Sequence, residues 1–537
     1  MFSRPLKPDL TANIARSVGS EKSSQTGWWQ SRWLLIAVVL LAAVPLLYPS
    51  IPPLVDLPGH MGRYRVQLMG AASPSLTSFY TFQWQLIGNL GVDLLVEPLA
   101  PIFGLELAVK LIVLSIPVLT VGGMIWIARE VHGRVPPTIF FALPLAYGHP
   151  FHFGFVNFAL SMALALNGFA LWLRLARKGR LRLRAIIFVP ISALIWVTHT
   201  FGWGALGVMA FSAEVVRQHD AGKRWLAALF PAGVQCLSLA PPLLAMVLWR
   251  SGDHVGGETF DWFNIRVKLT WLLMTLRDRW QWFDILCAVT ILGVIIYAWT
   301  ERGLEYSRNL AASAIFLLIV FIILPRVVFG SAYADMRLTP FMLAIAVIAI
   351  RPSPDATPRF LSRLALIGLS FMLVRTAATT TSLALASNRY DEALVALDHV
   401  PRGARLVTFV GHQCGLRWFS DRTEHLGAMA MVRREAFSND QWAMAGGQLL
   451  GVRYPNAVGF DRDPSELITA RKCSREYWRT AEIALARLPH DAFDYVWLLN
   501  PPPLKPEWMK GLNLIWTNGR DRLYGVVHAS PDQKLQQ

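Results

Sequence analysis

Long apolar runs separated by short polar connections dominate this chain between residues 33 and 386. Each run is long enough, or nearly long enough, to cross a bilayer as a helix. The runs lie near 33–50, 105–128, 136–148, 154–173, 185–198, 201–216, 225–249, 283–300, 309–329, 337–350 and 364–386. This pattern predicts a polytopic α-helical membrane protein with about eleven transmembrane helices.

The pattern changes after Ser387, where charges nearly balance and turn residues become frequent. Short apolar runs predict buried strands, and one amphipathic stretch predicts a helix. The predicted strands are 405–410, 495–499 and 523–527, and the predicted helix is 391–399. Residues 387–537 are therefore expected to form a small C-terminal α/β domain outside the membrane.

Composition and charge support this organisation. Hydrophobic residues make up 54% of the 537 residues and charged residues only 16%, too little polar surface for a soluble globule of this size. The net charge is +16, and basic residues are concentrated in blocks, namely the tail 1–32, the connections 174–184 and 217–224 and the stretch with Arg351, Arg359 and Arg363. Such blocks mark cytoplasmic loops, so they indicate topology and not nucleic-acid binding.

Counting spans from a cytoplasmic N-terminus places the first loop, 51–104, and the C-terminal domain on the extracytoplasmic side. The segment 33–47 follows a basic tail and lacks an Ala-x-Ala cleavage site, so it is expected to remain as the first span. Cys414 and Cys473 fall in the hydrophilic tail, where an oxidising compartment permits a disulfide, although spacing alone leaves that pairing open.

The first loop holds the leading candidate for chemistry, Asp56. Residues 59–69 have helical spacing that places His60, Arg63 and Gln67 on one face, and this helix is expected to lie along the membrane surface. Asp56 precedes it and Pro58 suits its first turn. A carboxylate beside cationic donors supplies a general base and a phosphate site, whereas the alternative is that Asp56 only caps the helix.

The same loop ends with Asp93, four residues after Asn89. Asp93 could join Asp56 around Mg²⁺ or Mn²⁺, because hard oxygen ligands suit these ions, or it could be a second helix cap. Nothing in the spacing fixes a metal, so no metal ligand is assigned and the cofactor stays open.

Further polar residues fall in connections on the same predicted side. His149 and His152 could bind phosphate or metal, or be ordinary hydrogen-bonding residues. Asn157, at the start of the next span, suggests packing first and substrate contact second. The remaining candidates are His199, in a turn between two spans, and Asp335 and Arg337, which follow a short connection. Asp335 and Arg337 either neutralise each other or leave the arginine free to clamp a lipid-linked phosphate.

The order of these motifs resembles the type-C integral membrane glycosyltransferases, and most closely an uncharacterised bacterial branch of that superfamily. The first-loop stretch from Pro53 to Arg63 has the form Pro-x-x-Asp-x-Pro-x-His-x-x-Arg, and the stretches 154–158 and 334–340 also look like recurring segments of that group. The resemblance covers residues 33–386. One departure is Leu57, which stands where many members carry a second acid.

The resemblance implies a GT-C-like fold in a bacterial inner membrane, with a sugar donor on polyprenyl phosphate and a glycan, lipid or protein acceptor. It implies that Asp56 deprotonates or orients the acceptor hydroxyl, while His60, Arg63 and Arg337 hold the donor phosphate. Leu57 puts a bound metal in doubt. Polar residues decorate the outer rim and not the span centres, which favours an enzyme over a transporter or scaffold. A polysaccharide polymerase or ligase remains the alternative enzyme.

Overall fold

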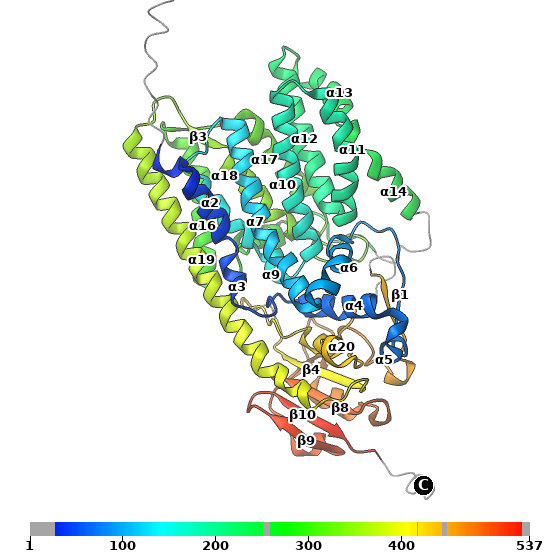
Figure 1. The fold of residues 1–537 in the computed structure, drawn as a ribbon. Coiled ribbons are helices and arrows are strands. Elements are labelled where there is room, and N and C mark those ends of the chain that lie inside the picture. The colour runs from blue at the N-terminus through cyan, green and yellow to red at the C-terminus, as the bar shows by residue number, and fades with distance from the viewer. Residues whose placement is uncertain (1–26, 251–257, 416, 443–447, 529–537) are drawn as a thin grey trace, which may run out of the picture.

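The structure is a computed structural model that describes residues 27–250, 258–415, 417–442 and 448–528. Most of the basic tail expected over residues 1–32 lies outside the described residues. Figure 1 shows a helical bundle in the upper part of the molecule and a β-sheet domain below it.

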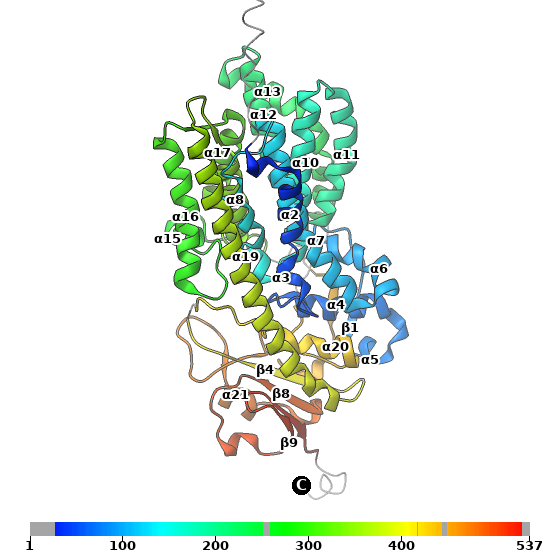
Figure 2. The ribbon, with the colours of Figure 1, turned by 60° about the vertical axis from the view of Figure 1, so that its left-hand side comes forward.

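The bundle is built from helices that alternate in direction between its two ends (Figures 1 and 2). Five helices of the described part are long and apolar enough to cross a membrane, namely α7, α10, α11, α16 and α19 with its short continuation to His399. The bundle helices are α2 (Arg32–Leu41), α3 (Val44–Leu47), α7 (Leu105–His132), α8 (Ile139–Ala142), α10 (Val156–Arg177), α11 (Leu181–Thr198), α12 (Thr200–Asp220), α13 (Trp225–Gln235), α14 (Pro241–Arg250), α16 (Gln281–Thr300), α17 (Arg308–Ile323), α18 (Ala334–Ile348) and α19 (Pro358–Leu394).

Three of the expected spans are not continuous α-helices. The run 33–50 divides into α2 and α3, and the run 225–249 divides into α13 and α14. The run 136–148 forms only α8 and the 3₁₀-helix η3 (Leu143–Tyr147), both buried. Pro45, Pro144 and Pro241 lie in the first turn of a new helical segment at these breaks, because proline has no N–H to continue the preceding helix.

Ion pairs between the ends of neighbouring helices lie at the end of the bundle that carries the basic loops. Arg177 at the end of α10 pairs with Glu130 near the end of α7 (2.5 Å), and Arg308 at the start of α17 pairs with Asp220 at the end of α12 (2.9 Å). Strands β2 (Leu304–Tyr306) and β3 (Ile350–Pro352) pair at this end as well. We call it the basic end.

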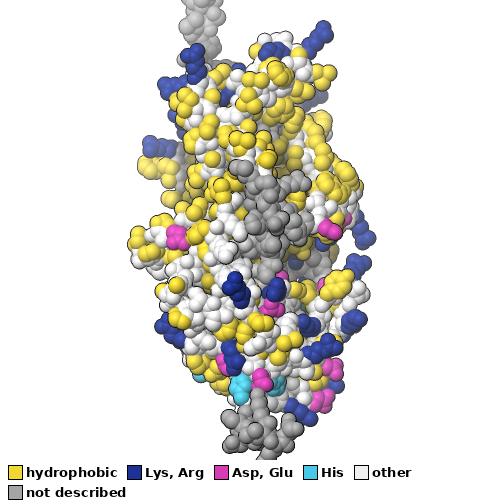
Figure 3. All heavy atoms as spheres, turned by 90° about the vertical axis from the view of Figure 1, so that its right-hand side faces the viewer, with side chains coloured by type: hydrophobic (Ala, Val, Ile, Leu, Met, Phe, Trp, Pro, Cys, Tyr) yellow, Lys and Arg dark blue, Asp and Glu magenta, His cyan; other side chains and the backbone are white. Residues whose placement is uncertain are grey.

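Hydrophobic side chains cover the upper part of the face in Figure 3, and charged side chains of both signs lie toward its lower end. The exposed apolar residues include Leu226 and Phe230 on α13 and Trp299 on α16. Large side chains of this kind on the outside of long apolar helices fit a lipid environment.

The opposite end carries the first loop and the C-terminal domain (Figure 1). Shorter elements build this outer layer: α4 (Leu57–Met69), α5 (Pro74–Thr77), β1 (Tyr80–Phe82), α6 (Gly91–Phe103), α9 (His149–Phe153) and α15 (Ile265–Leu273). α19 runs from the basic end to this end, where its last turns, continued by the 3₁₀-helix η5 (Val395–His399), lead into the sheet domain. The helix expected over 391–399 is thus the end of α19 together with η5.

The C-terminal domain contains a six-stranded sheet in the order β7-β6-β4-β8-β10-β9. Its strands are β4 (Leu406–His412), β6 (Leu467–Thr469), β7 (Arg479–Thr480), β8 (Tyr495–Leu499), β9 (Leu512–Thr517) and β10 (Arg522–Val526). The first four in the order are parallel, and β10 is antiparallel to β8 and β9. The short helical segments that accompany the sheet include η6 (Leu426–Ala428), α20 (Met429–Arg434) and α21 (Ala481–Ala486). A bond between Cys414 and Cys473 joins the segment after β4 to the segment after β6.

α4 is buried between the bundle and the C-terminal domain, so protein covers it on the side of α20 and η6, and its expected position along the membrane surface stays a prediction. It packs against α20 and η6, and a Cβ at Gly59 or Gly62 would lie 2.7 Å from Trp442 or 2.8 Å from Gln441. These two glycines, three residues apart on one helix face, let the domain approach the α4 backbone closely. β1 also pairs with β5 (Leu450–Val452) and ties the first loop to the domain.

Candidate functional site

Asp56 lies where the first loop enters α4, on a backbone held by α9. The Asp56 amide donates to the Phe153 carbonyl (2.9 Å). Gly154, which follows Phe153, has φ +99°. A Cβ at Gly154 would lie 2.7 Å from the Asp56 nitrogen, so only glycine fits there without displacing Asp56. This contact explains why the stretch 154–158 begins with glycine.

The Asp56 carboxylate does not cap α4, which argues against the capping alternative. Its Oδ1 lies 3.9 Å from Nε2 of His425 in the C-terminal domain. Burial raises the pKa of Asp56 well above its usual range, the charges of Glu424 and Asp463 raise it further, and the charge of Arg337 lowers it. Asp56 is therefore a buried carboxyl with increased basicity, surrounded by charged groups from three parts of the chain.

Arg337 is the cation of this site. It lies in the first turn of α18, is 8% exposed, and has no carboxylate within ion-pair distance among the residues that the structure describes. Its guanidinium lies over the Phe155 ring (4.0 Å), and Nη2 donates to Ser331 Oγ and Ala332 O (both 3.3 Å). The guanidinium thus keeps an unpaired positive charge near Asp56.

Asp335 does not neutralise Arg337, so that alternative of the sequence interpretation is wrong. It accepts instead from Lys268 on α15 (3.3 Å), and both side chains are buried. Lys268 also donates to the carbonyls of Phe321 and Leu324, 2.7 Å each. Asp335 is a packing residue that connects α15, α17 and α18, and its partner leaves Arg337 unpaired.

Arg63, expected to hold the donor phosphate, pairs with Asp93, expected to join Asp56 around a cation or to cap a helix. Arg63 Nη2 lies 2.7 Å from Asp93 Oδ1, and these side chains are 3% and 1% exposed. Arg63 also donates to Gln448. Arg63 is therefore not a free phosphate donor, and Asp93 does not join Asp56 around a cation, because a buried charge needs its compensating partner.

Asn157 fastens the first loop to α10. Its Oδ1 accepts from the Val92 amide (2.6 Å), and its Nδ2 donates to Asn89 O (2.8 Å) and Asp93 Oδ2 (3.0 Å). The amide makes its hydrogen bonds inside the protein, where it positions the loop, and substrate contact by Asn157 stays a prediction. His199 has a similar role, since its Nδ1 accepts from the Phe201 amide (3.1 Å) at the start of α12.

His149 and His152 belong to a buried polar network that joins α9 to the C-terminal domain. His149 Nε2 lies 3.2 Å from Arg277, and His152 Nδ1 lies 3.4 Å from Arg422. Arg422 also donates to Asp278, whose carboxylate lies 4.0 Å from His152. Burial and the charge of Arg277 lower the pKa of His149, so it is neutral, and both histidines hold the domain in place instead of facing a ligand.

His60 faces the C-terminal domain across α4. Its ring lies 5.1 Å from the Trp442 ring and 6.4 Å from that of Tyr64, and its buried Nδ1 has no hydrogen-bond partner in the described structure. His60, Arg63 and Gln67, which were predicted to share one face of the helix, therefore contact different groups. Gln67 donates to Asp93 O (2.9 Å) and to Glu97 (2.7 Å).

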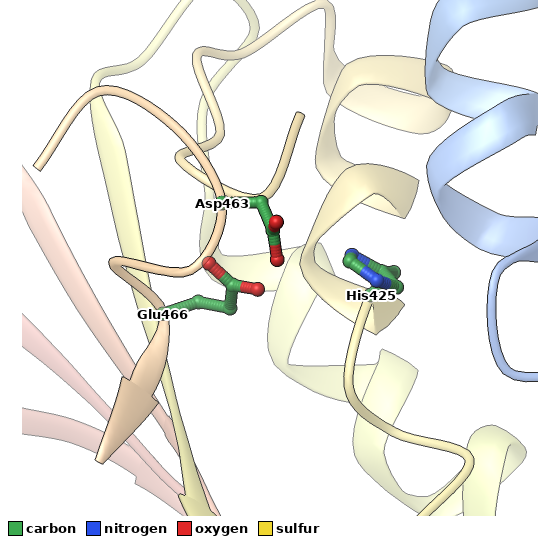
Figure 4. Close-up of side chains that lie close together, drawn as sticks. All are labelled: His425, Asp463 and Glu466. Atoms are coloured by element: carbon green, nitrogen blue, oxygen red, sulfur yellow. The ribbon is translucent and has the colours of Figure 1, made fainter. Parts of the chain in front are cut away.

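Residues of the C-terminal domain complete the site, and the sequence interpretation missed all of them. His425, Asp463 and Glu466 bring their ligand atoms within 4.8 Å of one another, and Figure 4 shows the two carboxylates and the imidazole turned toward a common point. The only sequence signal is the density of charged residues in 421–425 and 461–466, which does not reveal that both stretches meet Asp56.

Comparison with known proteins yields structural similarity alone. No protein-family model matches the sequence, and no curated protein matches it. Two crystal structures of ArnT from Cupriavidus metallidurans, one bound to undecaprenyl phosphate and one in the apo state, are similar to this chain. Each has a TM-score of 0.48 and 12% sequence identity, and each comparison covers 93% of this chain and 99% of ArnT.

Proposed function

We propose that this protein is a membrane glycosyltransferase that moves a sugar from a polyprenyl-phosphate carrier to a hydroxyl group of an envelope glycan, lipid or protein. The observation that carries the proposal is the convergence of Asp56 and Arg337. Asp56 is a buried carboxyl whose side chain does not cap α4, and Arg337 is a buried guanidinium with no carboxylate within ion-pair distance among the described residues. Each acts on the charge of the other where the bundle joins its outer domain. Two such groups are unfavourable for stability alone, which argues for a chemical role.

In the proposed step, the acceptor oxygen attacks the anomeric carbon of the donor sugar. The bond from that carbon to the phosphate oxygen breaks, and polyprenyl phosphate leaves. Asp56 takes the proton of the acceptor hydroxyl, and Arg337 donates hydrogen bonds to the phosphate as it gains charge. Guanidinium suits this role because it stays charged and presents paired donors in one plane.

The reaction is proposed to take place on the extracytoplasmic side of a bacterial inner membrane. The basic connections of the bundle lie at the end opposite Asp56, as expected for cytoplasmic loops. The Cys414–Cys473 bond in the C-terminal domain suits an oxidising compartment.

A test that does not require the sugar to be known measures release of polyprenyl phosphate. The purified protein in nanodiscs receives total lipid-linked sugars and a membrane extract as acceptor, and the released lipid is quantified by mass spectrometry. Asp56→Asn keeps the shape of the side chain and removes the base, so release should slow by about 10²- to 10⁴-fold. Asp398→Asn, at a carboxylate that is 74% exposed in η5, is the matched control and should leave release unchanged. Full activity in Asp56→Asn would refute the assigned role.

A further inference from the structure

Glu466 is a buried acid that receives no hydrogen bond from an N–H or hydroxyl group of the described residues. It is 0% exposed, and neither carboxylate oxygen has a hydrogen-bond partner in the described structure. It directly precedes β6, and its own carbonyl accepts from the Val410 amide on β4 (2.7 Å), so its backbone is fixed by the sheet. A buried carboxylate in this position needs a cation or a proton to compensate for its lost hydration.

Two further ligand groups lie next to Glu466. The donor atoms of His425, Asp463 and Glu466 all lie within 4.8 Å of one another (Figure 4). Asp463 is held through its amide, which donates to Gln441 O (3.1 Å). Neither Asp463 nor Glu466 has an ion-pair partner in the part of the chain that the structure describes.

His425 is oriented as a metal-binding histidine usually is. Its Nδ1 lies 3.2 Å from the Asp440 carbonyl, and because a carbonyl oxygen only accepts, Nδ1 carries the proton. The lone pair of the neutral ring is then on Nε2, the nitrogen that lies 3.9 Å from Asp56. A backbone carbonyl that fixes the tautomer in this way is the common second contact of zinc-binding histidines.

We propose that His425, Asp463 and Glu466 bind one divalent transition-metal cation of the Zn²⁺ or Mn²⁺ class. One imidazole and two carboxylates suit these ions, whereas Mg²⁺ and Ca²⁺ prefer oxygen ligands alone. Three protein ligands leave a coordination position open, as in catalytic zinc sites.

Cation binding at these three residues does not depend on the proposed transfer reaction. The bound cation would nevertheless lie close to Asp56. Asp56 lies next to His425, so the cation would face the carboxylate proposed as the base. The cation site is formed entirely by the C-terminal domain, whereas the first-loop acid comes from the other side of the interface. The inference concerns binding alone, and it holds or fails without reference to the identity of the sugar.

The test uses the full-length protein in detergent, stripped with a chelator and dialysed. Isothermal titration with ZnCl₂ and with MnCl₂ should give one ion per chain for at least one of the two metals. Glu466→Gln should weaken that binding at least tenfold, and Asp463→Asn should do the same by an independent change. Glu482→Gln makes the same chemical change on the exposed face of α21 and should bind as the wild type does.

The outcomes are separable. Absence of a stoichiometric site in the wild type, or equal affinity in Glu466→Gln and Glu482→Gln, overturns the cation proposal and indicates that Glu466 is compensated by a proton. If Asp56→Asn retains full transfer while the metal still binds, the proposed function fails and the cation site stands. Melting curves of the stripped variants show whether each is folded, and Asp463→Asn decides the question if Glu466→Gln is not.

Discussion

Arg337 offers the most direct test of the proposal that this site binds a lipid phosphate. Replacing it with Gln removes the charge and the paired donors and leaves a shorter, uncharged polar side chain. Arg337 is 8% exposed and lacks a carboxylate partner in the described structure, so this change removes a buried unpaired charge and should leave the protein folded.

The size of the effect follows from the contacts. In the free protein the guanidinium makes two hydrogen bonds of 3.3 Å, long ones, and leaves Nε unpaired, so it has donor capacity for a phosphate. A hydrogen bond to a charged group contributes about 1.5–3 kcal/mol. Loss of one such bond corresponds to about 10- to 150-fold weaker binding.

The assay measures binding of undecaprenyl phosphate to the purified protein in detergent. Arg337→Gln should weaken binding by that factor, and Arg337→Lys should fall between, because an ammonium keeps the charge but not the planar pair of donors. Arg351→Gln is the matched control: Arg351 is 44% exposed at the basic end and pairs with Glu305 (2.9 Å). Equal affinity in Arg337→Gln and Arg351→Gln would refute the phosphate-binding role.

Two further predictions concern the scaffold of the site. Asp93→Asn leaves the Arg63 charge buried without its carboxylate, so the free energy of unfolding should fall by about 3–5 kcal/mol, seen as a lower melting temperature that added salt does not restore. Gly154→Ala forces a side chain into a left-handed backbone and against Asp56, so transfer should slow and stability fall by about 1–3 kcal/mol. Gly122→Ala, where a Cβ meets nothing within 4 Å, is the control, and equal behaviour of the two alanine variants would contradict the packing described here.

The apolar pattern predicted much of the bundle, because burial in lipid requires long hydrophobic helices whatever their partners are. The strands expected at 495–499 and 523–527 correspond to β8 and β10, which are buried and rich in branched and aromatic residues. Local patterns also placed α4 and put Pro58 in its first turn. They did not show that the C-terminal domain covers α4, since that depends on contacts between residues almost 400 positions apart.

The site was harder to predict for the same reason. The sequence singled out Asp56 and Arg337, because isolated charges beside apolar runs stand out. The sequence did not show which of Arg337 and Arg63 lacks a carboxylate partner. Only the fold shows that Asp93 pairs with Arg63, whereas no carboxylate of the described residues lies within ion-pair distance of Arg337. His425 and Glu466 carried no signal, because charged residues are ordinary in a hydrophilic domain.

The uninterrupted course of α19 has a mechanical consequence. At 37 residues the helix is about 55 Å long, which exceeds the roughly 30 Å of a hydrocarbon layer. A continuous helix of this length would extend beyond the lipid. The sheet is fixed to its tip, where Arg389 pairs with Asp521. One residue added to α19 would rotate the C-terminal domain by about 100° about the helix axis. The length of α19 therefore sets the distance and the orientation of the C-terminal domain relative to the bundle.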